Sequence, residues 1–237
     1  MGTLYLIRHG QASYGEADYD RLSACGHEQA RALGRWLAQA RIDALFTGPL
    51  RRQVETGQTA TAAALATGVT LPAPLVLPAL AEYPAFEMLK HFVPRLVAED
   101  AKFQALETAP TPHLLDAAFH TVLSRWAGDE WAVEGVERVA AFVARVRAGL
   151  TRMLTATAPG TRLACVTSAG PIGVAVGLTF GIPDGRMIRT SIVIRNASIT
   201  ELRFRSQAGD PTWAPEQVSL VTFNNTGHLP DDLHTER

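Results

Sequence analysis

Three neighbouring residues near the start of the chain could act on a phosphate group: Arg8, His9 and Gly10, in the stretch LYLIRHGQAS. An arginine fork binds two phosphate oxygens at fixed geometry. A neutral imidazole is a nucleophile toward phosphorus when a carbonyl holds its other nitrogen as a donor. The glycine would let the backbone approach the phosphate closely. The alternative is a polar pair that only ends a strand.

The segments around this triplet predict the elements that hold it. Residues 3–8 form a short apolar run, which predicts a buried strand that ends at the triplet. Residues 26–40 carry apolar side chains at helical spacing and predict an amphipathic helix capped near Ser23. A strand over residues 44–47 and a helix over residues 50–66 repeat this order.

The second half of the chain continues the alternation of strands and helices. The patterns predict helices over residues 136–154 and 171–180 and strands over residues 162–167, 192–205 and 218–223. We therefore expect one α/β domain over residues 1–237 with three layers, a mostly parallel sheet with helices on both faces. A chain of 237 residues, of which 47% are hydrophobic, is long enough to bury one large core.

Residues 83–131 break this alternation, since they show helix-like pieces and no clear strand. We expect a helical insertion that caps the active site, because ligands of open α/β sheets bind beyond the carboxyl ends of the strands. Its aromatic side chains are expected to form a small core, with one of them facing the substrate as the alternative. These side chains are Phe86, Phe92, Trp126 and Trp131. The polar tail, residues 231–237, is expected to fray.

The composition argues against several classes of partner. A net charge of -1, with the charges scattered along the chain, favours neither nucleic acid nor an anionic membrane as a partner. The first apolar run is too short for an export signal and no apolar run is long enough to span a bilayer, so we expect a cytoplasmic protein. Cys25 and Cys165 lie in apolar periodic segments and are expected to be reduced core thiols.

Four segments, in chain order, resemble motifs of the histidine phosphatase superfamily, the phosphoglycerate-mutase-like proteins. LIRHGQA resembles the nucleophile motif, and LSACGHEQARALG resembles the first helix of the family. FTGPLRRQVETGQTA resembles the segment that carries the second arginine, and LAEYPAFE resembles the Leu-x-Glu acid motif. GVERVAAFVARVRAGL and CVTSAGPIG stand where the family has its long helix and its second-histidine strand.

The resemblance implies a role for each matching residue. His9 would be the nucleophile that becomes phosphorylated, and Arg8 and Arg52 would hold the phosphoryl oxygens, whereas the adjacent Arg51 is expected at the surface. Glu82 would protonate the leaving oxygen and then activate water, which requires a raised pKa that partial burial under the insertion could give. The further phosphate contacts implied are Gly10, Ser168 and Ala169, with Gln11 and His228 as additional candidates.

The implied chemistry needs neither a cofactor nor a metal, because two arginines can stabilise the phosphoryl oxygens. The histidines of the insertion also fit no usual zinc spacing. The expected partner is a small phosphorylated substrate whose identity the sequence does not give. The resemblance allows a homodimer, although the sequence does not determine the oligomeric state.

The chain also departs from the family pattern. Ser168 stands where the family usually has its second active-site histidine, and losing one preorganised donor costs on the order of a hundred- to a thousandfold in rate. His228, in FNNTGHLP, could take that place, or it could be an ordinary surface histidine. Gly48 replaces the usual serine before Pro49, and Ala12 replaces a threonine that is common in the mutases.

These features lead to three hypotheses for the function. The first is a phosphomonoester hydrolase, either slow or specialised, that acts through a phosphohistidine on His9. The alternative is a degenerate family member that binds a phosphorylated ligand or protein with little turnover, and Ser168 is the residue that supports it. A phosphoglycerate mutase is disfavoured by Ala12 and Ser168.

Overall fold

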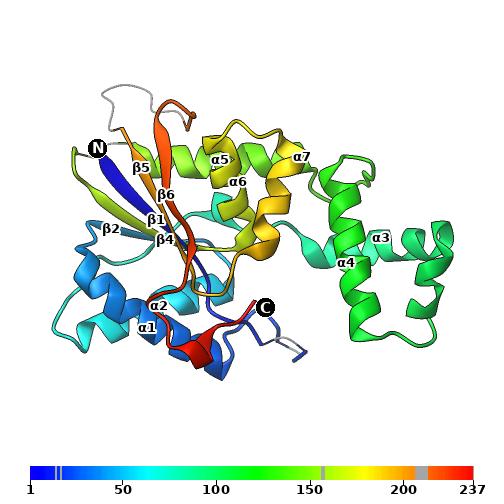
Figure 1. The fold of residues 1–237 in the computed structure, drawn as a ribbon, viewed down its shortest axis with the longest axis horizontal. Coiled ribbons are helices and arrows are strands. Elements are labelled where there is room, and N and C mark those ends of the chain that lie inside the picture. The colour runs from blue at the N-terminus through cyan, green and yellow to red at the C-terminus, as the bar shows by residue number, and fades with distance from the viewer. Residues whose placement is uncertain (14, 17, 156–157, 206–212, 237) are drawn as a thin grey trace.

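The computed structural model describes residues 1–13, 15–16, 18–155, 158–205 and 213–236 (Figure 1). A six-stranded sheet in the order β3-β2-β4-β1-β5-β6 forms its centre. The strands are β1 (Gly2–Arg8), β2 (Ala44–Thr47), β3 (Leu75–Val76), β4 (Arg162–Thr167), β5 (Ile199–Phe204) and β6 (Val218–Asn225). The first four pair in parallel, and β5 and β6 add an antiparallel edge. The predicted α/β fold with a mostly parallel sheet is therefore confirmed.

Helices cover both faces of the sheet (Figure 1). On β1, Leu4 and Leu6 belong to the core shared with α5 (Val139–Leu154) and α6 (Ala169–Thr179). Tyr5 and Ile7 alternate with them and belong to the core shared with α1 (Ala24–Ala40) and α2 (Arg51–Leu65). Because successive side chains of a strand point to opposite faces, a strand buried on both faces reads as an unbroken apolar run.

The segment between Glu82 and α5 extends to one side of the sheet, at the right of Figure 1. It contains α3 (Ala85–Glu99), η2 (Ala101–Leu106) and α4 (Pro112–Ala127). Phe92, Trp126 and Trp131 are buried in its core, as expected, with Trp131 packed against Phe92 at a centroid distance of 5.5 Å. Phe86 is 63% exposed, so its expected place in this core is wrong.

The strand predicted over residues 192–205 begins only at Ile199, because η3 (Ile188–Val193) precedes it. Two hydroxyl groups favour this helical turn over a strand. Thr190 Oγ1 donates to the carbonyl of Met187 at 2.7 Å, and Ser191 Oγ donates to that of Ile188 at 2.6 Å. Such bonds to the carbonyl three residues back compete with a strand ladder. The remaining short elements are η1 (Pro78–Leu80), α7 (Asp184–Met187) and η4 (Asp231–Leu233).

The expected fraying of the tail is wrong for residues 231–236, and Arg237 lies outside the described residues. Gln29 Nε2 donates to the carbonyl of Leu233 and to Thr235 Oγ1, both at 2.8 Å. Thr235 Oγ1 in turn donates to Asn196 Oδ1 at 2.9 Å. Gln29 and Asn196 are fully buried, so the tail satisfies polar groups that would otherwise be unpaired.

None of the described helices is long and apolar enough to cross a membrane. Both cysteines are free. Cys165 is buried in the sheet, whereas Cys25 is only partly buried.

Candidate active site

His9 follows β1 directly and is buried. Its Nδ1 lies 2.7 Å from the carbonyl oxygen of Gly10. Because a carbonyl only accepts, Nδ1 carries the ring proton and Nε2 keeps its lone pair. Arg52 Nε lies 3.0 Å from Nε2 and donates to it. Burial, Arg52 and Arg8 hold the pKa of His9 well below its ordinary range, so the ring is neutral with Nε2 as its basic nitrogen.

The loop after His9 is held by bonds to distant side chains. The amide of Gly10 donates to Thr56 Oγ1 at 3.0 Å, and the amide of Gln11 donates to Gln29 Oε1 at 2.7 Å. A Cβ on Gly10 would lie 2.5 Å from the carbonyl oxygen of Gly26, in the first turn of α1. Gly10 is therefore required by the close approach of α1, and its amide holds the loop rather than pointing to an anion.

Gln11 holds the start of α1 through its side chain. Ser23 Oγ donates to Gln11 Oε1 at 2.9 Å and accepts from the amide of Gly26 at 3.0 Å as the helix cap. The predicted cap at Ser23 is thereby confirmed. The structure thus places Gln11 behind the loop, in contact with the cap.

Arg52 lies in the first turn of α2 and is buried beside His9. Its Nη1 pairs with Asp20, whose other carboxylate oxygen accepts from the amide of Arg51 at 2.9 Å. The Arg51 side chain is exposed and pairs with Asp18 and Glu55. The structure therefore brings Arg52, and not Arg51, to the histidine. Asp20 was not expected from the sequence.

The guanidinium of Arg8 lies at the end of β1. Nη1 donates to the carbonyls of Ile194 and Glu236, the latter at 3.0 Å. Nε is buried and has no hydrogen-bond partner among the described residues. A buried donor without a partner costs about 1–3 kcal/mol, which an anionic oxygen within reach would offset.

Glu82 is partly buried and receives two backbone N–H groups. Oε2 accepts from the amide of Gly170, near the N-terminus of α6, and Oε1 accepts from that of Tyr83, both at 3.1 Å. Burial raises the pKa of Glu82, while the Gly170 N–H group and Arg52 partly oppose this effect. The carboxyl group can therefore hold a proton closer to neutral pH than an exposed glutamate does.

The backbone that carries Glu82 is fixed by Arg145, on α5. Arg145 Nη1 donates to the carbonyls of Ala79 and Ala81, both at 2.9 Å, and Nη2 donates to that of Glu82 at 3.2 Å. The carboxylate of Glu137 accepts from Arg145 Nε at 2.7 Å and from Nη2 at 2.8 Å. This ion pair holds the backbone of residues 79–82 against α5. This contact could not be predicted from the sequence, since Arg145 is one of several arginines on that helix.

Ser168 follows β4 directly. Arg8 pairs with Thr167 in the ladder between β1 and β4. The next residues, His9 and Ser168, therefore lie side by side at the carboxyl ends of these two strands. Ser168 is fully buried, and its Oγ accepts from Gln53 Nε2 at 2.7 Å. The hydroxyl proton is therefore available for donation to another acceptor. Ala169, the next residue, begins α6.

His228 packs against Trp36 on α1, with ring centroids 6.2 Å apart. Burial, with a smaller effect of His234, lowers the pKa of His228 to about 4. The backbone of His9 is instead reached by Asn196 and Ala197: the amide of Ala197 donates to the His9 carbonyl at 3.2 Å, and Asn196 Nδ2 lies 3.4 Å from it. The contacts of His228 therefore place it along α1 rather than beside Ser168.

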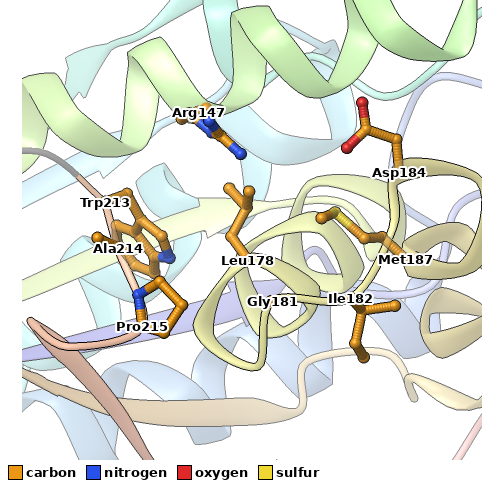
Figure 2. Close-up of a pocket in the computed structure, with 9 residues that line it drawn as sticks. All are labelled: Arg147, Leu178, Gly181, Ile182, Asp184, Met187, Trp213, Ala214 and Pro215. Atoms are coloured by element: carbon orange, nitrogen blue, oxygen red, sulfur yellow. The ribbon is translucent and has the colours of Figure 1, made fainter.

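A pocket of about 270 Å³ lies at the other end of α6 (Figure 2). Its lining residues are Arg147, Leu178, Gly181, Ile182, Asp184, Met187, Trp213, Ala214 and Pro215. Leu178 lies nine residues along α6 from Ala169, which corresponds to roughly 14 Å. This pocket is therefore separate from the site around His9. In the part of the chain that the structure describes, no three His, Cys, Asp or Glu side chains form a group that could hold a metal ion.

Solved structures with the same fold include three that can be compared along almost the whole chain. Mycobacterial hydrolase 2 is 20% identical, with 98% of this chain and 94% of that chain covered and a TM-score of 0.65. Mycobacterial glucosyl-3-phosphoglycerate phosphatase with inorganic phosphate is 20% identical, with 96% and 99% covered and a TM-score of 0.64. Phosphoserine phosphatase from Entamoeba histolytica, in complex with 3-phosphoglyceric acid, is 18% identical, with 97% and 100% covered and a TM-score of 0.62.

At these identities the likeness establishes the shared fold. No curated protein matches the chain. The sequence profile of the histidine phosphatase superfamily, branch 1, matches residues 4–93 and 98–214, which include His9, Arg52, Glu82 and Ser168. Since these ranges span most of the 237 residues, the chain belongs to the histidine phosphatase superfamily.

Proposed function

We propose that the protein is a phosphomonoester hydrolase that acts through a phosphohistidine on His9. The observation that carries this proposal is the neutral His9 ring, with Nδ1 on the Gly10 carbonyl and the Nε2 lone pair 3.0 Å from Arg52 Nε. Membership of the superfamily supports it. So do neighbours of the same fold that are named as phosphatases.

In the first step, His9 Nε2 attacks phosphorus and the bond from phosphorus to the alcohol oxygen breaks. The Arg52 guanidinium no longer donates to His9 Nε2 and donates to the phosphoryl oxygens instead, because these oxygens give its N–H groups an anionic acceptor. Arg8 Nε, the buried donor described above, supplies a second contact. Glu82 gives its proton to the leaving oxygen, so the alcohol departs neutral and the carboxylate remains.

In the second step, the Glu82 carboxylate takes a proton from water, and the water oxygen attacks phosphorus. The bond from phosphorus to Nε2 breaks, inorganic phosphate leaves, and His9 is again neutral with its proton on Nδ1. The N–H of Gly170 stabilises Glu82 whenever it is charged. Glu82 is then protonated and His9 neutral, as both were before the first step.

Ser168 would donate its hydroxyl proton to a phosphoryl oxygen while Gln53 holds its oxygen. This contact carries no positive charge, so the transition state is stabilised less than by a protonated histidine in that place. The same feature favours the second candidate function, a protein that binds a phosphorylated ligand or protein with little turnover.

The test is phosphate release from p-nitrophenyl phosphate and a panel of natural phosphomonoesters. We expect turnover in the wild type and its loss in His9→Ala and His9→Gln, the second of which keeps a polar side chain in the buried position. His113→Ala, at an exposed histidine of α4, is the matched control and should keep wild-type activity.

Two outcomes would reject the hydrolase mechanism. Release of phosphate by a folded His9→Gln variant at the wild-type rate would exclude His9 as nucleophile. No release by the wild type from any ester, together with saturable binding of inorganic phosphate in calorimetry, would favour the binding protein.

A further inference from the structure

Two aromatic rings stand beside the proposed phosphate site. The rings of Tyr19 and Phe86 meet edge to face, with centroids 5.3 Å apart and an interplanar angle of 80°. The guanidinium carbon of Arg52 lies 5.5 Å from the Tyr19 ring centroid, and the same guanidinium contacts His9. The aromatic pair is therefore separated from the nucleophile by a single side chain.

The two rings come from segments that the site already uses. Tyr19 immediately precedes Asp20, which pairs with Arg52, and Phe86 lies four residues after Glu82 in the first turn of α3. Phe86 is 63% exposed, although Met88 and Phe92 of the same helix are buried. Single exposed apolar residues are common. This one, however, lies against a half-buried tyrosine at the phosphate-binding arginine, where a substrate would meet it.

The charges around the rings decide what kind of substrate fits. Asp20 pairs with Arg52, and Asp18 and Glu55 pair with Arg51. The loop therefore brings carboxylates to this side of the site, and both arginines of α2 already have acidic partners. A second anionic group on the substrate would meet these carboxylates and would be disfavoured by like-charge repulsion.

We infer that the substrate is a phosphomonoester of an uncharged alcohol with an aromatic or extended apolar group, and that this group packs against Tyr19 and Phe86. The inference rests on the proposed function, because the phosphate must lie on His9, Arg8 and Arg52 for the alcohol to reach the rings. The rings of Tyr19 and Phe86 would give the apolar group of the substrate a large contact area. Esters that carry a carboxylate, such as phosphoglycerates, are poor substrates in this scheme.

The test compares propyl phosphate with 3-phenylpropyl phosphate. Both release a primary alcohol, so the difference in kcat/KM reports contact with the phenyl ring rather than leaving-group chemistry. We expect the phenyl ester to be better by on the order of tenfold or more, the scale of a well-filled apolar contact. Phe86→Ala should bring this ratio close to one. Phe180→Ala, which removes a 61% exposed phenylalanine at the far end of α6, should leave it unchanged.

The outcomes separate this inference from the proposed function. Hydrolysis of both esters at equal kcat/KM in the wild type, or a ratio that Phe86→Ala leaves intact, would overturn the apolar subsite and leave the hydrolase standing. Faster hydrolysis of 3-phosphoglycerate than of 3-phenylpropyl phosphate would also overturn it. If neither alkyl ester is hydrolysed, the hydrolase is rejected only when p-nitrophenyl phosphate and the natural esters also release no phosphate, and calorimetry decides on the subsite in either case. Tighter binding of the phenyl ester, lost in Phe86→Ala, supports the subsite, and equal binding rejects it.

Discussion

Replacing Gly170 by alanine should impair the proposed acid without unfolding the protein. A Cβ at this position would lie 2.0 Å from Glu82 Oε1 and 2.8 Å from Cδ1 of the Tyr83 ring. Non-bonded atoms do not approach so closely, so the Glu82 carboxylate must move away. It then loses the hydrogen bond from the Gly170 amide, which is 3.1 Å long in the wild type. Because Gly170 lies within α6, the added methyl also favours the helix by up to about 1 kcal/mol.

The size of the effect follows from the lost hydrogen bond. A bond to a charged group contributes about 1.5–3 kcal/mol, and in the proposed mechanism Glu82 becomes charged as it protonates the leaving oxygen. The expected loss in kcat is therefore about 10- to 150-fold for esters with poor leaving groups. Since the same N–H group opposes the rise in the pKa of Glu82, the alkaline limb of the pH profile should move to higher pH.

The assay is kcat as a function of pH for a primary alkyl phosphate and for p-nitrophenyl phosphate, together with thermal melts. Gly128→Ala is the matched control, because its new Cβ would come no closer than 3.2 Å to the flexible end of Glu130. If Gly170→Ala keeps wild-type kcat on the alkyl ester and an unmoved alkaline limb, Glu82 is not the acid held by α6.

Three further changes test neighbouring parts of the account. Glu82→Gln should remove the alkaline limb and slow alkyl esters more than p-nitrophenyl phosphate; equal losses on both would count against an acid role. Ser168→Ala should lower kcat by about a hundredfold if the hydroxyl reaches the phosphoryl group, whereas a lower melting temperature with unchanged kcat would make it structural. Arg145→Met leaves three carbonyls and the carboxylate of Glu137 without the donor that Arg145 provides, so the melting temperature and kcat should both fall. Arg145→Lys should restore stability in part. An unchanged kcat in Arg145→Met would show that Glu82 does not need Arg145 to position it.

Stability should also depend on pH through His9. Burial lowers the pKa of His9 below its ordinary value of 6.5, so below that pH the unfolded chain binds a proton that the folded chain does not. The free energy of unfolding should therefore fall from about pH 7.5 to about pH 5.5, by at most about 1.4 kcal/mol per pH unit for this group. Chemical denaturation at both pH values measures the decline, which His9→Gln should make smaller. An equal decline in His9→Gln would assign it to other groups.

The parts of the site that the sequence could predict are those set by local pattern. The apolar run before Arg8 fixes where β1 ends, and the register of α2 turns Arg52 rather than Arg51 toward the sheet. Ser23 reveals itself as a helix cap by its position before the periodic segment. Each of these predictions depends only on residues that lie close together in the sequence.

The parts that could not be predicted depend on partners far away in the chain. Arg145 holds the Glu82 backbone across more than sixty positions, and Gly10 bonds Thr56 across 46. From its sequence the tail is predicted to be loose, because no local pattern shows that its residues accept the hydrogen bonds of the buried Gln29 side chain. Such tertiary hydrogen bonds leave no periodic signal, so only the folded structure reveals them.

The most direct test of the central claim is to trap the phosphorylated protein. Wild type and Glu82→Gln are mixed with an aryl phosphate, quenched within milliseconds to seconds in base, where phosphohistidine survives, and digested for mass spectrometry. We expect phosphate on the peptide that contains His9, with more of it in Glu82→Gln because hydrolysis of the intermediate is slowed. Turnover with no phosphate on residue 9 in either protein, and with full activity in His9→Gln, would contradict it.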